Sequence, residues 1–185
     1  MTRQLTRYDA AMGTEQAGAT RWLTGEEQSV WRAYLDMNGR LNAQLNRHMQ
    51  TDAGISLVDF AVLVQVSEHP DGQPRARDLA VSLGWEKSRL SHQVARMQRR
   101  GLVERRDCDE DRRGAVIVLT DCGRRTIADA AAKHVAAVRR YLFDHLSGDE
   151  LRTFGSIASG VTERLDAAWP GESTSCAGVD QENCT

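Results

Sequence analysis

Residues Leu79 to Thr120 read LAVSLGWEKSRLSHQVARMQRRGLVERRDCDEDRRGAVIVLT, and this stretch decides the fold. Its pattern predicts the end of one helix, a tight turn at Gly84 and a second helix over about residues 86–100. A strand at 102–106, a charged loop at 107–113 and an apolar strand at 115–119 are predicted to follow. Helix, turn, helix and β-hairpin in this order indicate a winged helix-turn-helix.

The second of these helices separates into two faces when its residues are placed about 100° apart. Leu90, Val94 and Met97 fall on one side, which is the spacing of a helix packed on a core. The opposite side is polar and basic, and comprises Ser88, Ser91, His92, Ala95 and Arg99, with Arg89 and Arg96 beside them. Small hydroxyls permit a close approach to a major groove, and Arg and His supply donors for bases and phosphates. An arginine-rich face is also typical of a helix that is simply exposed to solvent. The elements that follow are needed to decide between a DNA-contacting helix and a solvent-exposed one.

The hairpin after this helix has the features of a DNA-contacting wing. Gly101 is placed as the C-terminal cap of the helix, and the loop between the two strands carries Arg112 and Arg113. A hairpin tip with two guanidinium groups is suited to a phosphate backbone or a minor groove. Helix and wing together therefore predict a partner of double-stranded DNA.

At these residues the chain resembles the MarR family of bacterial transcription regulators. The resemblance rests on Leu79-Ala80, Lys87-Ser88, Gly101-Leu102-Val103 and above all Asp111-Arg112-Arg113-Gly114 followed by Val118-Leu119-Thr120 and Gly123-Arg124. It covers about residues 24–167. It implies a mainly α fold with a small β-hairpin wing, in which long N- and C-terminal dimerisation helices flank the winged helix-turn-helix.

The outward helix face, the hairpin tip and the resemblance together predict which residues contact DNA: Lys87, Ser88, Arg89, Ser91, His92, Arg96, Arg99, Arg112 and Arg113. It aligns Arg113 with the family arginine that reaches into the minor groove. Asp111 is placed to support the wing by accepting hydrogen bonds from nearby guanidinium groups. His92 stands where many family members have arginine, so the family's base preference there is not carried over.

The charge distribution agrees with this assignment. The chain of 185 residues has a formal net charge of −2, whereas residues 75–113 hold eleven Lys or Arg and seven Asp or Glu, a local net charge of +4. No apolar run approaches the length of a membrane span, and the N-terminus lacks the apolar core of a signal peptide. We therefore expect a cytoplasmic protein without a membrane partner.

The flanking segments predict long helices. Thr24 and Glu27 form a capping-box pattern that opens a helix to about residue 50, Ser56 caps the next helix, and Thr120 caps a helix that runs to about Leu146. A last helix is predicted to end near Ala168. The expected organisation is a flexible extension at 1–22, one domain at 23–168 and a flexible tail at 169–185. Within the domain, the winged helix-turn-helix spans about 55–120 and the dimerisation helices span about 24–50 and 120–168.

The terminal helices carry apolar stripes that a small winged domain would leave uncovered, including Trp31, Tyr34, Leu142 and Phe143. The resemblance implies that these helices interlock with those of a second subunit, and a homodimer would read an inverted-repeat operator. A self-contained helical bundle is the alternative.

The resemblance further implies a repressor that a small aromatic or phenolic ligand releases from DNA. Trp31, Tyr34, Asp59 and Phe60 belong to the helices that would line the ligand crevice, and Trp22 is a further candidate. The alternative is that the aromatic residues are core and that Asp59 completes the cap begun by Ser56.

Two other readings stay open. A thiol-based redox regulator would use Cys108 in the wing or Cys122 in the first turn of a helix, near basic residues that favour a thiolate. A winged helix that binds protein instead of DNA is the second. No cysteine and histidine spacing predicts a metal site, and no cofactor is expected. Because no nucleophile, base and oxyanion donor can be grouped, we predict no catalytic residue and no enzyme.

Overall fold

The computed structural model describes residues 21–108 and 111–168, with the backbone alone at 107, 108 and 111–114. Almost all of the extension predicted for 1–22, and the whole tail predicted for 169–185, lie outside the described residues. The chain divides between Ala43 and Gln44 into two units, and each is described by itself.

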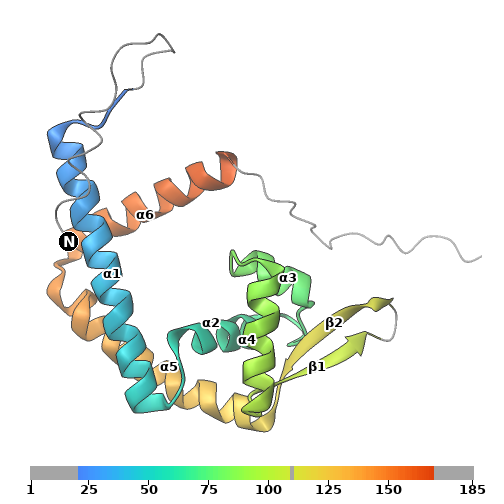
Figure 1. Cartoon of the computed structure of the whole chain (residues 1–185). Coiled ribbons are helices and arrows are strands. Elements are labelled where there is room, and N and C mark those ends of the chain that lie inside the picture. The colour runs from blue at the N-terminus through green and yellow to red at the C-terminus, as the bar shows by residue number, and fades with distance from the viewer. Residues whose placement is uncertain (1–20, 109–110, 169–185) are drawn as a thin grey trace, which may run out of the picture. The chain divides into compact units, whose positions relative to one another are not determined.

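The described residues form seven regular helices, counting one short 3-10 helix, and one antiparallel pair of strands. In chain order these are α1 (Gly25–Ala53), α2 (Leu57–Glu68), α3 (Ala76–Ser82), α4 (Lys87–Arg99), β1 (Val103–Cys108), β2 (Asp111–Leu119), α5 (Asp121–Tyr141), the 3-10 helix η1 (Phe143–His145) and α6 (Gly148–Ala168) (Figure 1). The predicted fold class, mainly helical with a β-hairpin wing, is confirmed. No helix in the described ranges is long and apolar enough to cross a membrane.

The first unit, as far as it is described, is the N-terminal part of α1. The predicted capping box is present: the Glu27 N–H donates to Thr24 Oγ1 at 3.2 Å, and the Thr24 N–H donates to Glu27 Oε2 at 2.7 Å. Residues 21–40 are all exposed. This part of α1 therefore owes its helical form to local capping and not to burial within its own unit.

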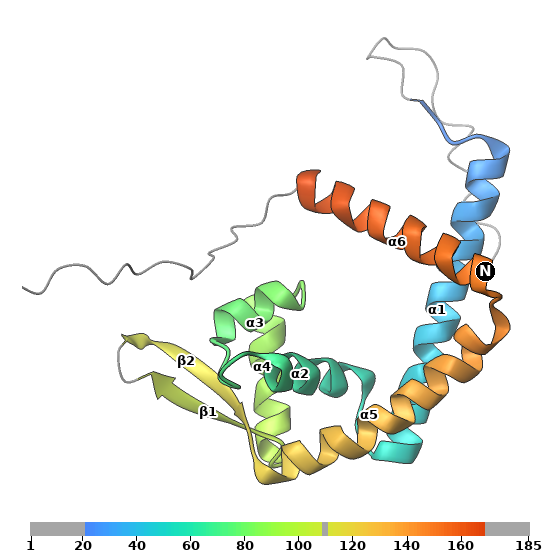
Figure 2. The same ribbon diagram turned by 180° about the vertical axis from the view of Figure 1, so that it is seen from behind.

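The second unit contains the hydrophobic core that holds the recognition helix. The predicted core face of α4, which comprises Leu90, Val94 and Met97, is at most 4% exposed. It packs with Leu63 of α2 and Leu79 of α3 in one cluster of buried side chains. Figures 1 and 2 both show α2, α3 and α4 gathered together, with the hairpin extending from them. The helix-turn-helix turn contains Gly84, whose φ of +62° is unfavourable for residues with a side chain.

The wing is a longer hairpin than its sequence pattern predicts. Val103 pairs with Leu119 at the base of the ladder, and pairing continues to Asp107 and Ala115 before a register shift. The predicted loop at 107–113 was wrong at its ends, because β1 reaches Cys108 and β2 begins at Asp111. Strands pair through backbone hydrogen bonds and do not require apolar side chains. The apolar content of the sequence alone therefore underestimates the length of an exposed hairpin. Leu102, predicted in the strand, precedes it.

The Leu-Thr-x-x-Gly motif joins the wing to α5. Thr120 caps α5 by accepting from the Gly123 N–H at 2.9 Å, and its hydroxyl donates to the Gly101 carbonyl at 2.6 Å. A Cβ atom at Gly123 would collide with the carbonyl oxygen of Leu102. The glycine is therefore required because the start of α5 lies against the backbone that begins β1.

The long helix after the wing ends earlier than predicted. We expected it to continue to about Leu146, but α5 stops at Tyr141 and η1 follows. His145 Nε2 lies 2.9 Å from the Arg140 carbonyl oxygen, and Arg139 and Asp144 form an ion pair at 2.9 Å. These contacts satisfy a terminal carbonyl and favour the turn, so the apolar stripe alone overestimates the helix.

Candidate nucleic-acid interface

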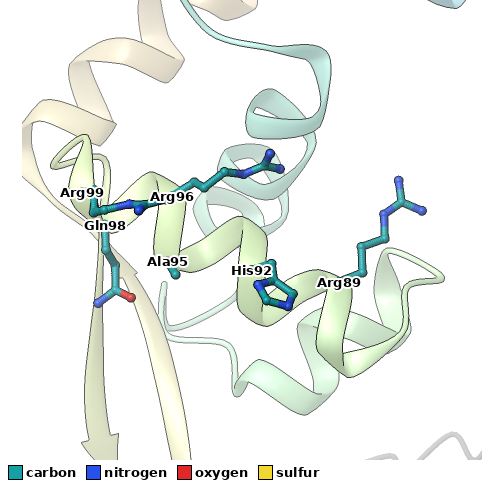
Figure 3. A pocket seen from close by; sticks show the side chains of 6 residues that line it. All are labelled: Arg89, His92, Ala95, Arg96, Gln98 and Arg99. Carbon is teal, nitrogen blue, oxygen red and sulfur yellow. The ribbon is translucent and has the colours of Figure 1, made fainter.

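The outward face of α4 is a polar surface built on a buried apolar one. Every residue assigned to DNA from this helix is exposed: Lys87, Ser88, Arg89, Ser91, His92, Arg96 and Arg99. An open groove of about 830 Å³ lies along this face, lined by Arg89, His92, Ala95, Arg96, Gln98 and Arg99 (Figure 3). The structure thus brings the predicted residues of α4 together on one surface. The opposite, buried face of the helix packs on the core and fixes the orientation of α4.

Trp85, in the turn before α4, supports one of these arginines. The Arg89 guanidinium carbon lies 4.5 Å from the centroid of the Trp85 ring. Trp85 is half-buried against the core, and its backbone N–H donates to the Ala80 carbonyl at 2.8 Å. The sequence analysis did not identify Trp85, because this residue precedes α4 and the spacing rules for side chains on one helical face do not extend to it.

A second arginine, Arg96, is joined to the interior by a buried amide. Gln93 Nε2 donates to Asp59 Oδ1 at 2.5 Å, and Gln93 Oε1 accepts from the Arg96 guanidinium. Asp59 and Gln93 are 5% and 2% exposed. Gln93 was missed, and the signal was a polar residue inside the apolar stripe of Leu90, Val94 and Met97.

Asp59 is surrounded by donors from its own corner of the fold. The predicted capping box is present: the Asp59 N–H donates to Ser56 Oγ at 3.0 Å, and the Ser56 N–H donates to Asp59 Oδ2 at 2.9 Å. Arg100 Nη1 donates to the same Oδ2 at 2.8 Å, while Arg100 Nη2 donates to the Gly54 carbonyl at 2.7 Å. The carboxylate therefore connects the α1–α2 corner to both the middle and the end of α4.

The wing residues are described by backbone only. Asp111, Arg112 and Arg113 lie at the start of β2, but their side chains, like that of Cys108, are outside the described residues. Arg106 on β1, which is described, pairs with Glu104 at 2.9 Å. The DNA contacts predicted for Arg112 and Arg113 stay predictions.

The four ligand candidates fall into both units. In the first unit, the rings of Trp31 and Tyr34 stack with centroids 5.5 Å apart, and both side chains are about half exposed. In the second unit, Phe60 is buried at 8% exposure, with its ring centroid 4.7 Å from that of His134. Burial lowers the pKa of His134 below its ordinary value. Trp22, the further candidate, is 67% exposed.

Of the two cysteines considered for redox control, only Cys122 has a described side chain. Cys122 is an exposed free thiol in the first turn of α5. Within 21–108 and 111–168, no group of three or more His, Cys, Asp or Glu side chains is placed to hold a metal ion.

Comparisons with known proteins agree with this geometry. The model of the MarR family matches residues 53–114, which include α2 to the first part of β2. AbsC, a MarR family transcriptional regulator from Streptomyces coelicolor, is 40% identical, with a TM-score of 0.74, over 80% of this chain and 99% of AbsC. Sco3205, a MarR family transcriptional regulator from the same organism whose structure was solved in complex with DNA, is 40% identical with a TM-score of 0.76, over 80% of this chain and 93% of Sco3205.

A relative with lower sequence identity is also named as a transcriptional regulator. The HTH-type transcriptional regulator YfiV of Bacillus subtilis (strain 168) is 25% identical over 147 residues, which cover 79% of this chain and 89% of YfiV. The similarity to AbsC and Sco3205 extends over nearly their whole length at 40% identity, well beyond the winged helix-turn-helix alone. The chain therefore belongs to the MarR family, and it is a DNA-binding transcription regulator and not an enzyme.

Proposed function

We propose that the protein is a homodimeric repressor that binds a pseudo-palindromic operator through α4 and the wing, and that a small ligand releases it. The observation that carries this proposal is the division of α4 into a buried face and an exposed face of hydroxyl, histidine and arginine side chains. The DNA complex of the relative Sco3205 supports the choice of DNA over a protein partner. Two recognition helices in a dimer would read half-sites about one duplex turn apart.

Selection from a random duplex library tests the DNA part of the proposal. The purified full chain is expected to enrich an inverted repeat with half-sites about 10 base pairs apart, and to bind it as two chains per duplex. Mass measurement of the bound complex gives the stoichiometry. Enrichment of no sequence, or of a single half-site bound by one chain, would contradict the proposal.

An exposed apolar stripe on α6 supports the dimer in this proposal. Its large apolar side chains Leu151, Phe154, Ile157, Val161 and Leu165 are between 41% and 63% exposed. They fall within an arc of about 120° on the helix, which is the pattern of a packed face. A second copy of the chain offers the same stripe, so the two faces can bury one another in a symmetric interface.

A charge placed in the α6 stripe tests this interface. Phe154→Glu should convert the dimer to a monomer in sedimentation experiments and weaken binding to the inverted repeat. Thr153→Glu adds the same charge to the neighbouring residue outside the stripe and should leave the dimer intact. A Phe154→Glu protein that is folded and still dimeric would contradict this use of α6.

The ligand part of the proposal rests on Trp31 and Tyr34. Their stacked, half-exposed rings could stack against a planar molecule, whereas the side chains of Asp59 and Phe60 are buried. Benzoate and 4-hydroxybenzoate are suitable probes, because both combine a ring with an anion. We expect millimolar probe to lower operator affinity in the wild type and to have a weaker effect on Trp31→Ala. Equal responses of the two proteins would remove Trp31 from the ligand site.

A further inference from the structure

The connection between Asp59 and Arg96 has a fixed direction. A carboxylate only accepts hydrogen bonds and a guanidinium only donates them, whereas a glutamine amide does both. Gln93 lies between the two, so its Nε2 must face Asp59 and its Oε1 must face Arg96, which is the arrangement observed. The side-chain amide of Gln93 therefore links the exposed Arg96 guanidinium to the buried Asp59 carboxylate through two hydrogen bonds.

Asp59 is well suited to be the fixed end of this connection. It is 5% exposed and accepts from Ser56, Arg100 and Gln93 in addition to its capping role. The Ser56 contacts come from its own helix cap, and Arg100 is also tied to the Gly54 carbonyl. Charge-assisted hydrogen bonds of this kind are among the strong ones in proteins, so the carboxylate has little freedom to move.

From these contacts we propose that Asp59 and Gln93 are positioning residues for DNA recognition, which hold Arg96 in one place on the outward face of α4. This inference rests on the proposed function, in which that face lies against DNA. Arg96 lines the groove on α4 together with Arg99. Arg99, by contrast, has no hydrogen-bond or ion-pair partner among the described residues. On this proposal Arg96 is a preset contact, whereas Arg99 is expected to become ordered only when DNA binds.

Presetting a long side chain has a measurable consequence for binding. An arginine that is already ordered loses less conformational entropy on contact with DNA, and it makes that contact in one geometry. Releasing Arg96 should therefore lower operator affinity about two- to tenfold, the range expected for ordering one flexible side chain. The effect must also depend on Arg96 itself.

A double-mutant cycle on the selected inverted repeat tests this dependence. Gln93→Met keeps the length of the side chain but removes both hydrogen bonds, and Arg96→Ala removes the group that is positioned. We expect Gln93→Met to weaken binding two- to tenfold in the wild-type background and by less than twofold in the Arg96→Ala background. Gln98→Met is the matched control, because it makes the same change at an exposed glutamine of α4 that has no hydrogen bond to Asp59 or Arg96 among the described residues; its effect should be the same in both backgrounds.

The outcomes separate this inference from the proposed function. If the wild-type chain selects no duplex, the proposed function fails. If it selects an inverted repeat and Gln93→Met binds that repeat like the wild type, or weakens binding equally with and without Arg96, the positioning role is wrong. Should Gln93→Met not fold, ¹⁵N relaxation of arginine side chains in the wild type gives the same answer: Arg96 should be more ordered than Arg99, and equal mobility would overturn the inference.

Discussion

The guanidinium carbon of Arg89 lies 4.5 Å from the ring centroid of Trp85, so the first arginine of α4 rests on the aromatic residue that precedes the helix. A cation over an indole face gains about 0.5–1 kcal/mol at an exposed site. Trp85 thus packs against the core and also contacts Arg89 at the edge of the predicted DNA surface.

Replacement of Trp85 should therefore weaken operator binding through Arg89. Trp85→Leu is expected to lower affinity about two- to fivefold, corresponding to the cation–π energy, while Trp85→Phe retains a ring and should recover part of the loss. Titrations of both variants with and without Arg89→Ala measure the coupling. A loss in Trp85→Leu that is unchanged when Arg89 is absent would mean that the tryptophan acts only through folding.

The wing gives a prediction whose sign is informative. Arg113→Ala should cut operator affinity on the order of tenfold and reduce the slope of log affinity against log salt by about one, because one phosphate or minor-groove contact is lost. Asp111→Ala should also weaken binding, since the wing would lose the acceptor that is predicted to hold nearby guanidinium groups. Simple electrostatics predicts the reverse for Asp111. Tighter binding by Asp111→Ala together with a wild-type salt slope for Arg113→Ala would exclude this docking of the wing.

His134 makes the stability of the second unit depend on pH. Its Nδ1 is buried without a hydrogen-bond partner in the described part of the chain, and burial lowers the pKa of the ring below its ordinary value of 6.5. The unfolded chain then binds a proton more readily than the folded one, so the free energy of unfolding falls as pH drops through about 6.5. It levels off below the folded pKa.

Urea unfolding of the wild type and His134→Leu checks this prediction. Between about pH 7.5 and 5.5, the wild type should lose more stability than the variant, because only the wild type carries the titrating ring. Curves that fall in parallel would assign the pH dependence to other groups.

Ligand control and redox control predict different behaviour of the cysteines. The variant in which Cys108, Cys122, Cys176 and Cys184 are all replaced by Ser should bind the operator and respond to ligand like the wild type. Peroxide should have little effect on either protein. If peroxide releases the wild type and fails to release Cys108→Ser or Cys122→Ser, the redox alternative is correct.

The sequence predicted those parts of the fold that follow from local pattern. The spacing of Leu90, Val94 and Met97 located the core face of α4, and the Ser56–Asp59 cap located the start of α2. Local patterns do not specify where a chain bends in solvent. The end of α5 at Tyr141 is accompanied by the contact of His145 with the Arg140 carbonyl, and the full length of the hairpin depends on backbone pairing between β1 and β2. Apolar periodicity expresses neither.

The candidate site was predictable as a surface and not as a network. Exposed residues of α4 were identified because they lie opposite an apolar stripe. The link from Gln93 to Asp59 joins residues 34 positions apart, and it forms only when α2 and α4 pack together. For the same reason Asp59 could be placed among the ligand candidates from its helix alone, whereas the hydrogen bonds that its carboxylate accepts from Gln93 and Arg100 were not predictable.

The affinity of His92→Ala for the operator tests most directly whether the outward face of α4 reads operator sequence. His92 is exposed on that face, and its removal should cost about 1–3 kcal/mol on the selected inverted repeat if it contacts a base edge. Binding to a scrambled duplex at the same salt should hardly change, and His69→Ala, which removes a histidine from outside α4, should bind both duplexes like the wild type. If His92→Ala and Arg99→Ala both bind the operator with wild-type affinity, α4 does not read DNA with this face.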